Sequence, residues 1–437
     1  MTMQSYGRKI SLCEDGNIEV INDDPIEFLR AYKDKLNVKT KHPLSEILAG
    51  MTGFVAYDAV RLFEDIPDSN VNIDAVPDLL FKFYNDLIVF DHQLNKIVLS
   101  SIAHIDASQK NLKQSYLTAM ENIDAIIEKL SKCVAPKTTL SNTNKPNDVV
   151  MTCSSIETDI DDKSYMQMVE IAKQYIKAGD IFQIVLSRRF RKKYAANPFE
   201  IYKALSICSP SPYMFYLDNT DFQIVGASPE KLVSVENGII ESCPLAGTRP
   251  RGKNPQDDAN MAEDLLNDGK ETAEHMMLVD LARNDVGAVA TPATVNVTRL
   301  KEIQRFSHVM HLSSTVQGKL REDLDAFDTL RAAFPAGTLS GAPKIRAMQI
   351  LDGLENSRRG IYGGAICALS GNGDLISCIA IRMAVLKDKV ATIRTGAGIV
   401  FDSDAKKEVE ETGHKAKSVF AAIQLAETWQ QTQKNSQ

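Results

Sequence analysis

The last third of the chain consists of apolar, β-branched runs separated by turns that are too short for a crossover helix. Gly371–Gly373 separates the runs 361–370 and 375–387, and Lys387–Asp388 leads into a third run, 389–401. Strands joined by such tight turns must pair antiparallel, because a parallel pair needs a connection of a dozen residues or more. The alternating strand–helix pattern of a parallel sheet is missing here. We therefore predict an α+β fold with an antiparallel β-sandwich core and helices on its outer faces.

The polar, aperiodic stretch 132–150 predicts a linker or a long surface loop. It divides the chain into an N-terminal subdomain, 1–131, and a longer catalytic domain, 151–428, which a tail, 429–437, follows. Asn237–Gly238, between two apolar runs in the longer unit, is a strong signal for a tight hairpin.

The charge and the cysteines limit the class of partner and the compartment. The net charge is −7, which argues against nucleic acid or an anionic membrane as partner, although local cations could still hold a small anion. The seven cysteines are scattered and form no CxxC motif, which argues against a zinc site and a disulfide framework. We see no apolar run of transmembrane length and no signal-peptide core. We therefore expect a cytoplasmic protein.

Two acidic pairs with helical spacing are the sharpest chemical signal. Glu271 and Glu274 lie in a helix predicted over about 256–283, and Glu408 and Glu411 lie in one predicted over about 404–428. Residues three apart share one helix face, and two such faces together would offer carboxylates to a hard ion such as Mg²⁺. The alternative is a solvated, salt-bridged helix surface. The apolar run after Glu274 favours a buried helix.

Three other features each allow two interpretations. The glycine-containing stretches 246–252 and 395–398 follow predicted strands, so they are either tight turns or sites where backbone N–H groups approach an anion. Arg382, in the predicted strand 375–387, is either a structural ion-pair residue or a carboxylate ligand. His311, on another predicted strand, is either a satisfied core histidine or a general acid–base. We expect either His308 or His311 to be buried, because residues three apart on a strand face opposite sides.

Ten ordered segments resemble the chorismate-binding enzyme family, and most closely the large subunits of anthranilate synthases. The matching segments include PLAGTRPRG, KETAEHMMLVDLARND, GIYGGAI and RTGAGIVFDSD, and all ten are 179–190, 209–217, 226–233, 244–252, 270–285, 306–312, 334–344, 360–366, 379–386 and 394–404. The resemblance covers most of residues 160–425, and it is looser in the first 130 residues. It implies the chorismate-utilising enzyme fold.

The resemblance implies a Mg²⁺-dependent lyase of tryptophan and aromatic amino acid biosynthesis, which converts chorismate and ammonia to anthranilate and pyruvate. A separate glutamine amidotransferase subunit would supply the ammonia. Ala246 stands where family members with an enzyme amine as nucleophile carry lysine, and alanine leaves room for external ammonia. The alternatives are the large subunit of an aminodeoxychorismate synthase, or a non-catalytic chorismate-binding subunit.

The resemblance also implies roles for individual residues. Glu274 and Glu411 would bind Mg²⁺, and Glu271 and Glu408 beside them would hold water or transfer protons. Glu271 is the leading candidate for the base that removes the C2 proton, with Glu230 as the alternative, and His311 would support departure of a leaving group. The residues that would contact the substrate are Gly247, Thr248, Thr338, Tyr362, Arg382, Gly396, Ala397, Gly398 and Lys415.

Pro212, Tyr213 and Met214 match a segment that binds feedback tryptophan in relatives. Ser209 stands where asparagine is usual, and the LLES-like motif that helps to bind tryptophan is not among these residues. We therefore expect a vestigial tryptophan site with weak or absent inhibition.

Overall fold

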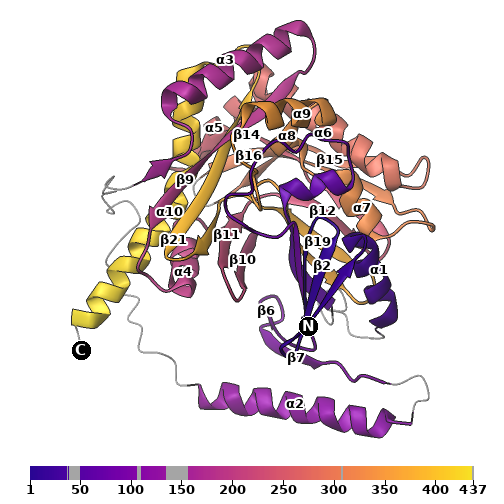
Figure 1. Ribbon diagram of the computed structural model, residues 1–437. Coiled ribbons are helices and arrows are strands. Elements are labelled where there is room, and N and C mark those ends of the chain that lie inside the picture. The colour runs from indigo at the N-terminus through magenta and orange to yellow at the C-terminus, as the bar shows by residue number, and fades with distance from the viewer. Residues whose placement is uncertain (37, 39–49, 106–109, 134–155, 307–308, 436–437) are drawn as a thin grey trace.

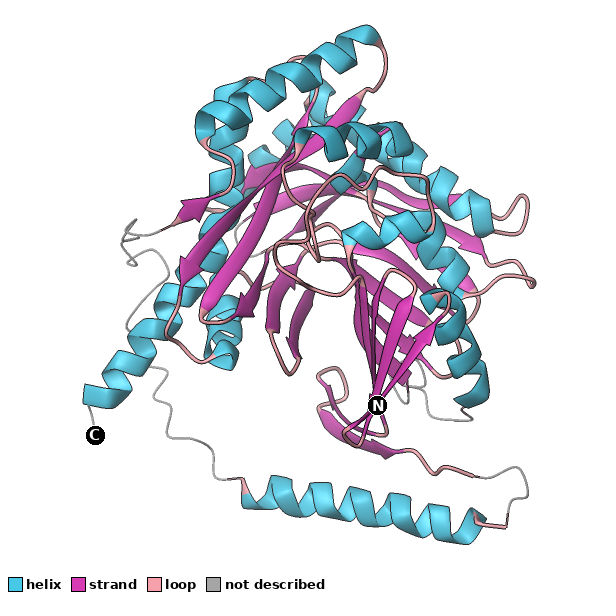
Figure 2. Cartoon of the chain, in the orientation of Figure 1, coloured by secondary structure: helices cyan, strands magenta, loops and turns pink. Residues whose placement is uncertain are grey.

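The computed structural model describes residues 1–36, 38, 50–105, 110–133, 156–306 and 309–435. Two large sheets form its centre, and every strand pair within them is antiparallel, as the tight turns predict (Figure 2). The α+β prediction is therefore confirmed.

The larger sheet has twelve strands, and β15 (Asn296–Arg305) joins it beside β16. In sheet order its other strands are β14 (Leu245–Pro250), β16 (Val309–Lys319), β13 (Ile239–Ser242), β12 (Lys231–Glu236), β19 (Leu375–Ile379), β18 (Ala365–Ser370), β4 (Gly50–Val55), β5 (Leu79–Tyr84), β1 (Thr2–Tyr6), β2 (Lys9–Glu14) and β3 (Asn17–Asn22). The smaller sheet contains β10 (Tyr213–Asp218), β11 (Gln223–Ser228), β20 (Met383–Lys387), β21 (Val390–Ile399), β9 (Gln183–Lys193) and β17 (Gly341–Ala342), with β8 (Glu157–Thr158) beside β9. A separate hairpin is formed by β6 (Asp86–Asp91) and β7 (Lys96–Ser101).

The helices surround these sheets (Figure 1). They are α1 (Pro25–Leu36), α2 (Leu112–Lys132), α3 (Asp162–Ala178), α4 (Pro198–Cys208), α5 (Pro255–Asn267), α6 (Gly269–Val289), α7 (Ala326–Ala333), α8 (Gly337–Ser340), α9 (Lys344–Leu354), α10 (Ala405–Asn435) and the 3₁₀ helix η1 (Tyr57–Leu62). Within the described parts of the chain, every helix is too short or too polar to cross a membrane.

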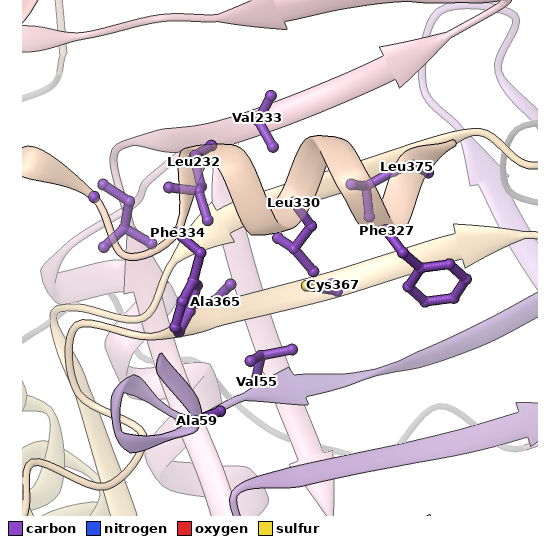
Figure 3. Packing of buried hydrophobic residues seen from close by; sticks show 14 of the residues in the cluster. Val55, Ala59, Leu232, Val233, Phe327, Leu330, Phe334, Ala365, Cys367 and Leu375 are labelled. Atoms are coloured by element: carbon purple, nitrogen blue, oxygen red, sulfur yellow. The ribbon is translucent and has the colours of Figure 1, made fainter. Parts of the chain in front are cut away.

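The two sheets pack face to face through apolar side chains. Phe54 and Ile366 of the larger sheet meet Phe215 and Ile224 of the smaller one in a single buried cluster. On the outer face of the larger sheet, Leu330 of α7 lies above the strand that carries Cys367 (Figure 3). The outer face of the smaller sheet is covered by α4 and α10. The sandwich arises because its central strands, such as β18 and β21, bury both of their faces, one against the partner sheet and one against helices.

The N-terminal segment and the longer unit share the larger sheet. β4 pairs with β18 over its whole length, from Gly50 opposite Ser370 to Val55 opposite Ala365. The sheet is therefore continuous across the division that the composition predicts. Most of the predicted linker, 132–150, lies outside the described residues, as does His308.

The prediction of one long helix over 256–283 is wrong. Asp268 ends α5 and caps α6, because its carboxylate accepts hydrogen bonds from the backbone N–H groups of Lys270 and Glu271. The last helix also differs from its prediction, since α10 continues to Asn435. Residues 429–435 contain no glycine or proline to stop it.

The prediction of a single strand over 375–387 is also wrong. β19 belongs to the larger sheet and β20 to the smaller one, and the chain crosses between the sheets at residues 380–382. Arg382 has a left-handed backbone with φ of 51°, a conformation that is uncommon for a residue with a side chain. Arg382 therefore lies at a bend between the sheets and not within a strand.

Candidate active site

A β-bulge in β14 holds His311. The register between β14 and β16 shifts between Ala246 and Thr248, and Gly247 lies at the shift with φ of 64°. The stretch 246–252 is therefore mainly a strand, and not the turn that its glycines suggested. His311 on β16 has its Nδ1 2.9 Å from the carbonyl oxygen of Gly247 and 3.0 Å from the hydroxyl of Thr248.

The tautomer of His311 follows from this contact. A carbonyl oxygen can only accept, so Nδ1 carries the hydrogen and donates it, which leaves the lone pair on Nε2. Burial lowers the pKa of His311, and the nearby Arg382 adds to the decrease. A neutral imidazole with a free Nε2 is suited to accept a proton or a hydrogen bond.

The first turn of α6 brings Glu271 to the same bulge. A Cβ on Gly247 would lie 3.1 Å from Oε2 of Glu271 and 2.8 Å from Leu265, so the glycine allows this close approach. Nη2 of Arg249 forms an ion pair with Oδ2 of Asp268, the N-cap of α6, at 2.8 Å. Nη1 of the same arginine lies 3.6 Å from Oε1 of Glu271. These contacts fix Glu271 beside β14 and β16, the strand pair that carries His311.

The second acidic pair lies on α10, which packs against β21. Residues 395–398 lie within β21 and pair with β9, in keeping with the predicted strand run 389–401, and they do not form the tight turn that was one of the two interpretations. Lys415 of α10 donates to the carbonyl oxygen of Gly396 at 2.9 Å and forms an ion pair with Glu411 at 2.7 Å. α10 therefore positions Glu408, Glu411 and Lys415 beside the glycine-containing strand.

The two acidic helix turns lie close enough to interact. Burial raises the pKa of Glu274, and the carboxylates of Glu271 and Glu411 add to the increase, against the effect of Lys270. Burial also raises the pKa of Glu408, and Glu411 again contributes. Two carboxylate pairs that are far apart in the sequence therefore share one electrostatic environment. Among the described residues, no three or more Asp, Glu, His or Cys side chains are grouped as a metal site.

Arg382 lies near His311, Tyr362 and Glu411, all of which its charge reaches. The charge of Arg382 lowers the pKa of His311, and Tyr362 and Glu411 in turn act to raise the pKa of Arg382. Arg382 is therefore part of the same site. Burial lowers the pKa of its guanidinium. Considering only the described residues, no hydrogen bond or ion pair engages that guanidinium. A largely buried cation without a partner is costly, and an anionic ligand would satisfy it.

Tyr362 and the glycines of β21 pack against one another. A Cβ on Gly396 would lie 2.5 Å from the carbonyl oxygen of Leu186 and 2.9 Å from the Tyr362 hydroxyl, so only glycine fits there. A Cβ on Gly398 would similarly approach Nε2 of Gln183 at 2.9 Å. Gln183 was not among the predicted site residues, and its buried Oε1 has no hydrogen-bond partner within the part of the chain that the structure describes. Its place at the start of a strand gave no signal of this contact.

Glu230 lies on the connection between β11 and β12 and is almost fully buried. Burial raises its pKa to about 8, although Lys415 and two hydrogen bonds oppose the change. One of those bonds comes from the hydroxyl of Thr338 on α8, at 3.3 Å. Glu230 is therefore largely protonated at neutral pH and can donate a proton.

Arg359, which was also not among the predicted residues, connects the segments that carry the site. Its guanidinium donates at 2.6 Å to the carbonyl oxygens of Leu339 and Val185, and it binds Glu355 through two nitrogens. The same group lies over the rings of Tyr57, at 4.5 Å, and Tyr362, at 6.0 Å. This buried network fixes α8, β9 and Tyr362 relative to one another.

Electrostatic or hydrogen-bond contacts connect several of the predicted site residues, namely Glu274 with Glu271 and Glu411, Thr248 with His311, Thr338 with Glu230, and Lys415 with Gly396. Their roles in catalysis, substrate binding and metal binding stay predictions. The three residues of the expected tryptophan segment do not face one way. Tyr213 packs between the sheets with Cys378, whereas Met214 faces the opposite cluster beneath α4 and α10. Pro212 is exposed. Tryptophan binding by this segment therefore stays a prediction.

Comparison with known proteins defines the class that this fold and site represent. The chain belongs to the chorismate binding enzyme family, whose sequence profile matches residues 4–421. It is 42% identical over 430 residues to anthranilate synthase component 1 of Acetivibrio thermocellus, covering 98% of this chain and 85% of that protein. It is also 42% identical to the protein of the same name from Aquifex aeolicus, covering 93% and 81%.

A solved structure has the same fold. Anthranilate synthase component I from Streptococcus pneumoniae superposes with a TM-score of 0.79 at 38% sequence identity, and the match covers 96% of this chain and 92% of that one. The resemblance drawn from the sequence motifs is therefore confirmed at the level of the family.

Proposed function

We propose that this chain is the chorismate-aminating component of an anthranilate synthase, which forms anthranilate and pyruvate from chorismate and ammonia. The observation that carries this proposal is that Glu411 interacts with the acidic turn of α6, through Glu274, and also with Arg382. The names of the relatives that this chain resembles over most of its length support the same reaction.

Arg382 and Lys415 are the cations that would hold the two carboxylates of chorismate. The guanidinium of Arg382 can bind a carboxylate through two parallel hydrogen bonds. Lys415 donates a hydrogen bond to the carbonyl oxygen of Gly396, so its ammonium group lies beside β21 and would bind the other carboxylate of chorismate. An acidic protein needs such local cations to bind a dianion.

The acidic residues fit a Mg²⁺ ion. Neighbouring carboxylates contribute to the raised pKa values of Glu274 and Glu408, which means that their negative charges repel one another. A bound divalent cation would relieve that repulsion. Mg²⁺ commonly takes only one or two protein carboxylates, with water and substrate oxygens as its other ligands. Glu274 and Glu411 would hold the ion, which when bound supplies positive charge beside the substrate carboxylate.

The protein groups can carry the proton transfers of both steps. In the first step ammonia forms a bond to C2, the ring double bonds shift, and the C4 hydroxyl leaves as water. Protonated Glu230 can supply the proton for that departure. In the second step Glu271 takes the C2 proton, the bond from C3 to the enolpyruvyl oxygen breaks and the ring becomes aromatic. The released enolpyruvate then takes up a proton from water at its methylene carbon and becomes pyruvate. The Nε2 of His311, which carries the lone pair, could support departure of the leaving group by accepting the proton that the new ammonium group at C2 gives up.

Ala246 supports ammonia as the nucleophile. It lies in β14 next to the bulge, opposite Leu312, and its methyl group carries no amine that could attack the ring. The name component 1 of the relatives implies a second component, and a glutamine amidotransferase subunit would supply the ammonia. We expect the chain alone to use ammonium salts.

A product assay tests this function. The purified chain is incubated with chorismate, Mg²⁺ and ammonium chloride, and anthranilate fluorescence and pyruvate are measured together. Equal amounts of the two products support the proposal. A stable, non-aromatic amino product without pyruvate would identify an aminodeoxychorismate synthase, and no turnover would indicate a binding subunit.

A further inference from the structure

His275 is a fully buried histidine on α6, directly after Glu274 and one turn after Glu271. Its Nε2 lies 2.6 Å from the hydroxyl oxygen of Ser314 on β16, and Ser314 is also fully buried. Neither residue is among the predicted site residues. A short hydrogen bond between two buried side chains therefore joins the acidic turn of α6 to the strand that carries His311.

Ser314 is itself held in place by two other segments. β15 has a bulge opposite it, where the register with β16 shifts and Lys301 adopts φ of 54°. The backbone N–H of Lys301 donates to the Ser314 hydroxyl at 3.0 Å. The backbone N–H of Ser314 donates to the carbonyl oxygen of Pro244, just before β14, at 3.3 Å. His275 is therefore bonded to a hydroxyl group whose position the sheet fixes.

The bond at Nε2 is what a histidine adds at this position. Within the described residues the imidazole has no other hydrogen-bond partner, and its Nδ1 is buried and unpaired. An unpaired buried nitrogen destabilises the folded state, so an apolar side chain of similar size would suit the position better if only packing mattered.

We infer that His275 is a positioning residue, which fixes the rotation of α6 about its axis so that Glu271 and Glu274 point into the site. This inference rests on the proposed function. Glu271 shares the side of the helix that carries His275, and Glu274 lies about 100° around the axis from it, so a roll of the helix would break the bond and move both carboxylates. The other buried side chains of α6, such as Val279 and Val286, are apolar, and their contacts have no directional preference.

Variants that keep or remove the bond test this inference. The amide of His275→Gln lies as many bonds from Cβ as Nε2 of histidine does, and either of its ends can pair with the hydroxyl of Ser314. His275→Leu fills similar space but cannot pair. We expect kcat of the leucine variant to fall roughly tenfold to 100-fold, as a small misplacement of a catalytic group does. The KM for chorismate should stay unchanged, because Arg382 and Lys415 lie outside α6, and glutamine should restore most of kcat.

Metal binding gives a second readout that does not depend on turnover. Mn²⁺ is the probe, because carboxylate sites for Mg²⁺ also accept it, and free Mn²⁺ is measured by electron paramagnetic resonance during titration of the substrate-free chain. We expect His275→Leu to bind Mn²⁺ roughly tenfold more weakly, at the low end of the range for groups that orient metal ligands. His275→Gln should bind it like the unmodified protein.

Val286→Ala is the control for loss of packing. Val286 is buried on the same helix, about three turns after His275. This variant should lower the unfolding temperature because it leaves a cavity, but it should change neither kcat nor Mn²⁺ binding. His275→Leu should show the opposite pattern, with an almost unchanged unfolding temperature. If His275→Leu does not fold, as judged by near-ultraviolet circular dichroism, His275→Met provides the same test.

Three results would overturn the inference. They are an unchanged kcat and Mn²⁺ affinity in the folded leucine variant, equal losses in the leucine and glutamine variants, or a KM for chorismate that rises as kcat falls. Absence of anthranilate from the unmodified chain would instead contradict the proposed function, and the Mn²⁺ titration would then decide the inference. Failure of the unmodified chain to bind Mn²⁺ would contradict the metal assignment, and kcat would then decide it.

Discussion

The hydroxyl of Thr338 donates a hydrogen bond across 3.3 Å to the buried carboxyl of Glu230. This contact joins α8 to the connection before β12, and it keeps the carboxyl oriented although that carboxyl is protonated at neutral pH. We expect Glu230→Gln to lower kcat by about 100-fold to 10,000-fold, the usual range for loss of a general acid. The control is Glu236→Gln, at an exposed position on β12, which should leave kcat unchanged.

The pKa of Glu230 also predicts the pH profile. Burial raises this pKa to about 8, so the protonated acid is lost above that pH and kcat should fall there. The rates are compared at a constant concentration of free ammonia, because ammonia itself titrates on the alkaline side. A profile that stays level from pH 7 to about pH 9 under these conditions would argue against an acid role for Glu230.

The same shift has a consequence for stability. The folded protein binds the Glu230 proton more tightly than the unfolded chain, because burial raises the pKa from its ordinary 4.5 to about 8. The free energy of unfolding should therefore decrease as the pH rises between these two values. Glu230→Gln should remove this contribution, which chemical denaturation at several pH values would reveal as a smaller decrease in stability.

Arg382 should determine the affinity for chorismate. Arg382→Lys keeps the charge but loses the two parallel hydrogen bonds, so we expect the KM for chorismate to rise by roughly tenfold to 100-fold. The KM for ammonia should not change. Arg283→Lys, at an exposed site on α6 where the arginine pairs with Asp280, is the control and should behave like the unmodified protein.

Gly396 should tolerate no side chain. Gly396→Ala would place a methyl group 2.5 Å from the carbonyl oxygen of Leu186 and 2.9 Å from the hydroxyl of Tyr362, so it should destabilise the protein by about 1–3 kcal/mol and raise the KM for chorismate. Gly413→Ala on α10 is the matched control, since a Cβ there meets nothing within 4 Å. It should stabilise the protein by about 0.5–1 kcal/mol in thermal unfolding, because alanine favours the helix.

Local sequence signals predicted those elements that depend on neighbouring residues. The Asn237–Gly238 turn, for example, joins β12 to β13 as its sequence predicts. The break at Asp268 was missed because the acidic and apolar spacing continues on both sides of it. The residues Asn267–Asp268–Gly269 carried a turn signal that the helical periodicity outweighed.

Contacts between distant segments could not be read from spacing alone. The run around Arg382 is apolar on both sides, so nothing local reveals that β19 and β20 belong to different sheets. The Arg359 network depends on Val185 and Leu339, which the fold brings together from separate segments. The convergence of Glu274 with Glu411 was likewise an expectation from family resemblance, since each pair alone could have been a solvated helix face.

The response to Mg²⁺ of Glu274→Gln and Glu411→Gln tests the central claim, that the two acidic helix turns form one metal-dependent site. Initial rates of anthranilate formation are measured over a Mg²⁺ titration at saturating chorismate and ammonia. We predict that each variant needs at least about tenfold more Mg²⁺ for half-maximal rate. Glu410→Gln, at an exposed position next to Glu411, should match the unmodified protein. An unchanged Mg²⁺ dependence in both site variants would contradict the claim.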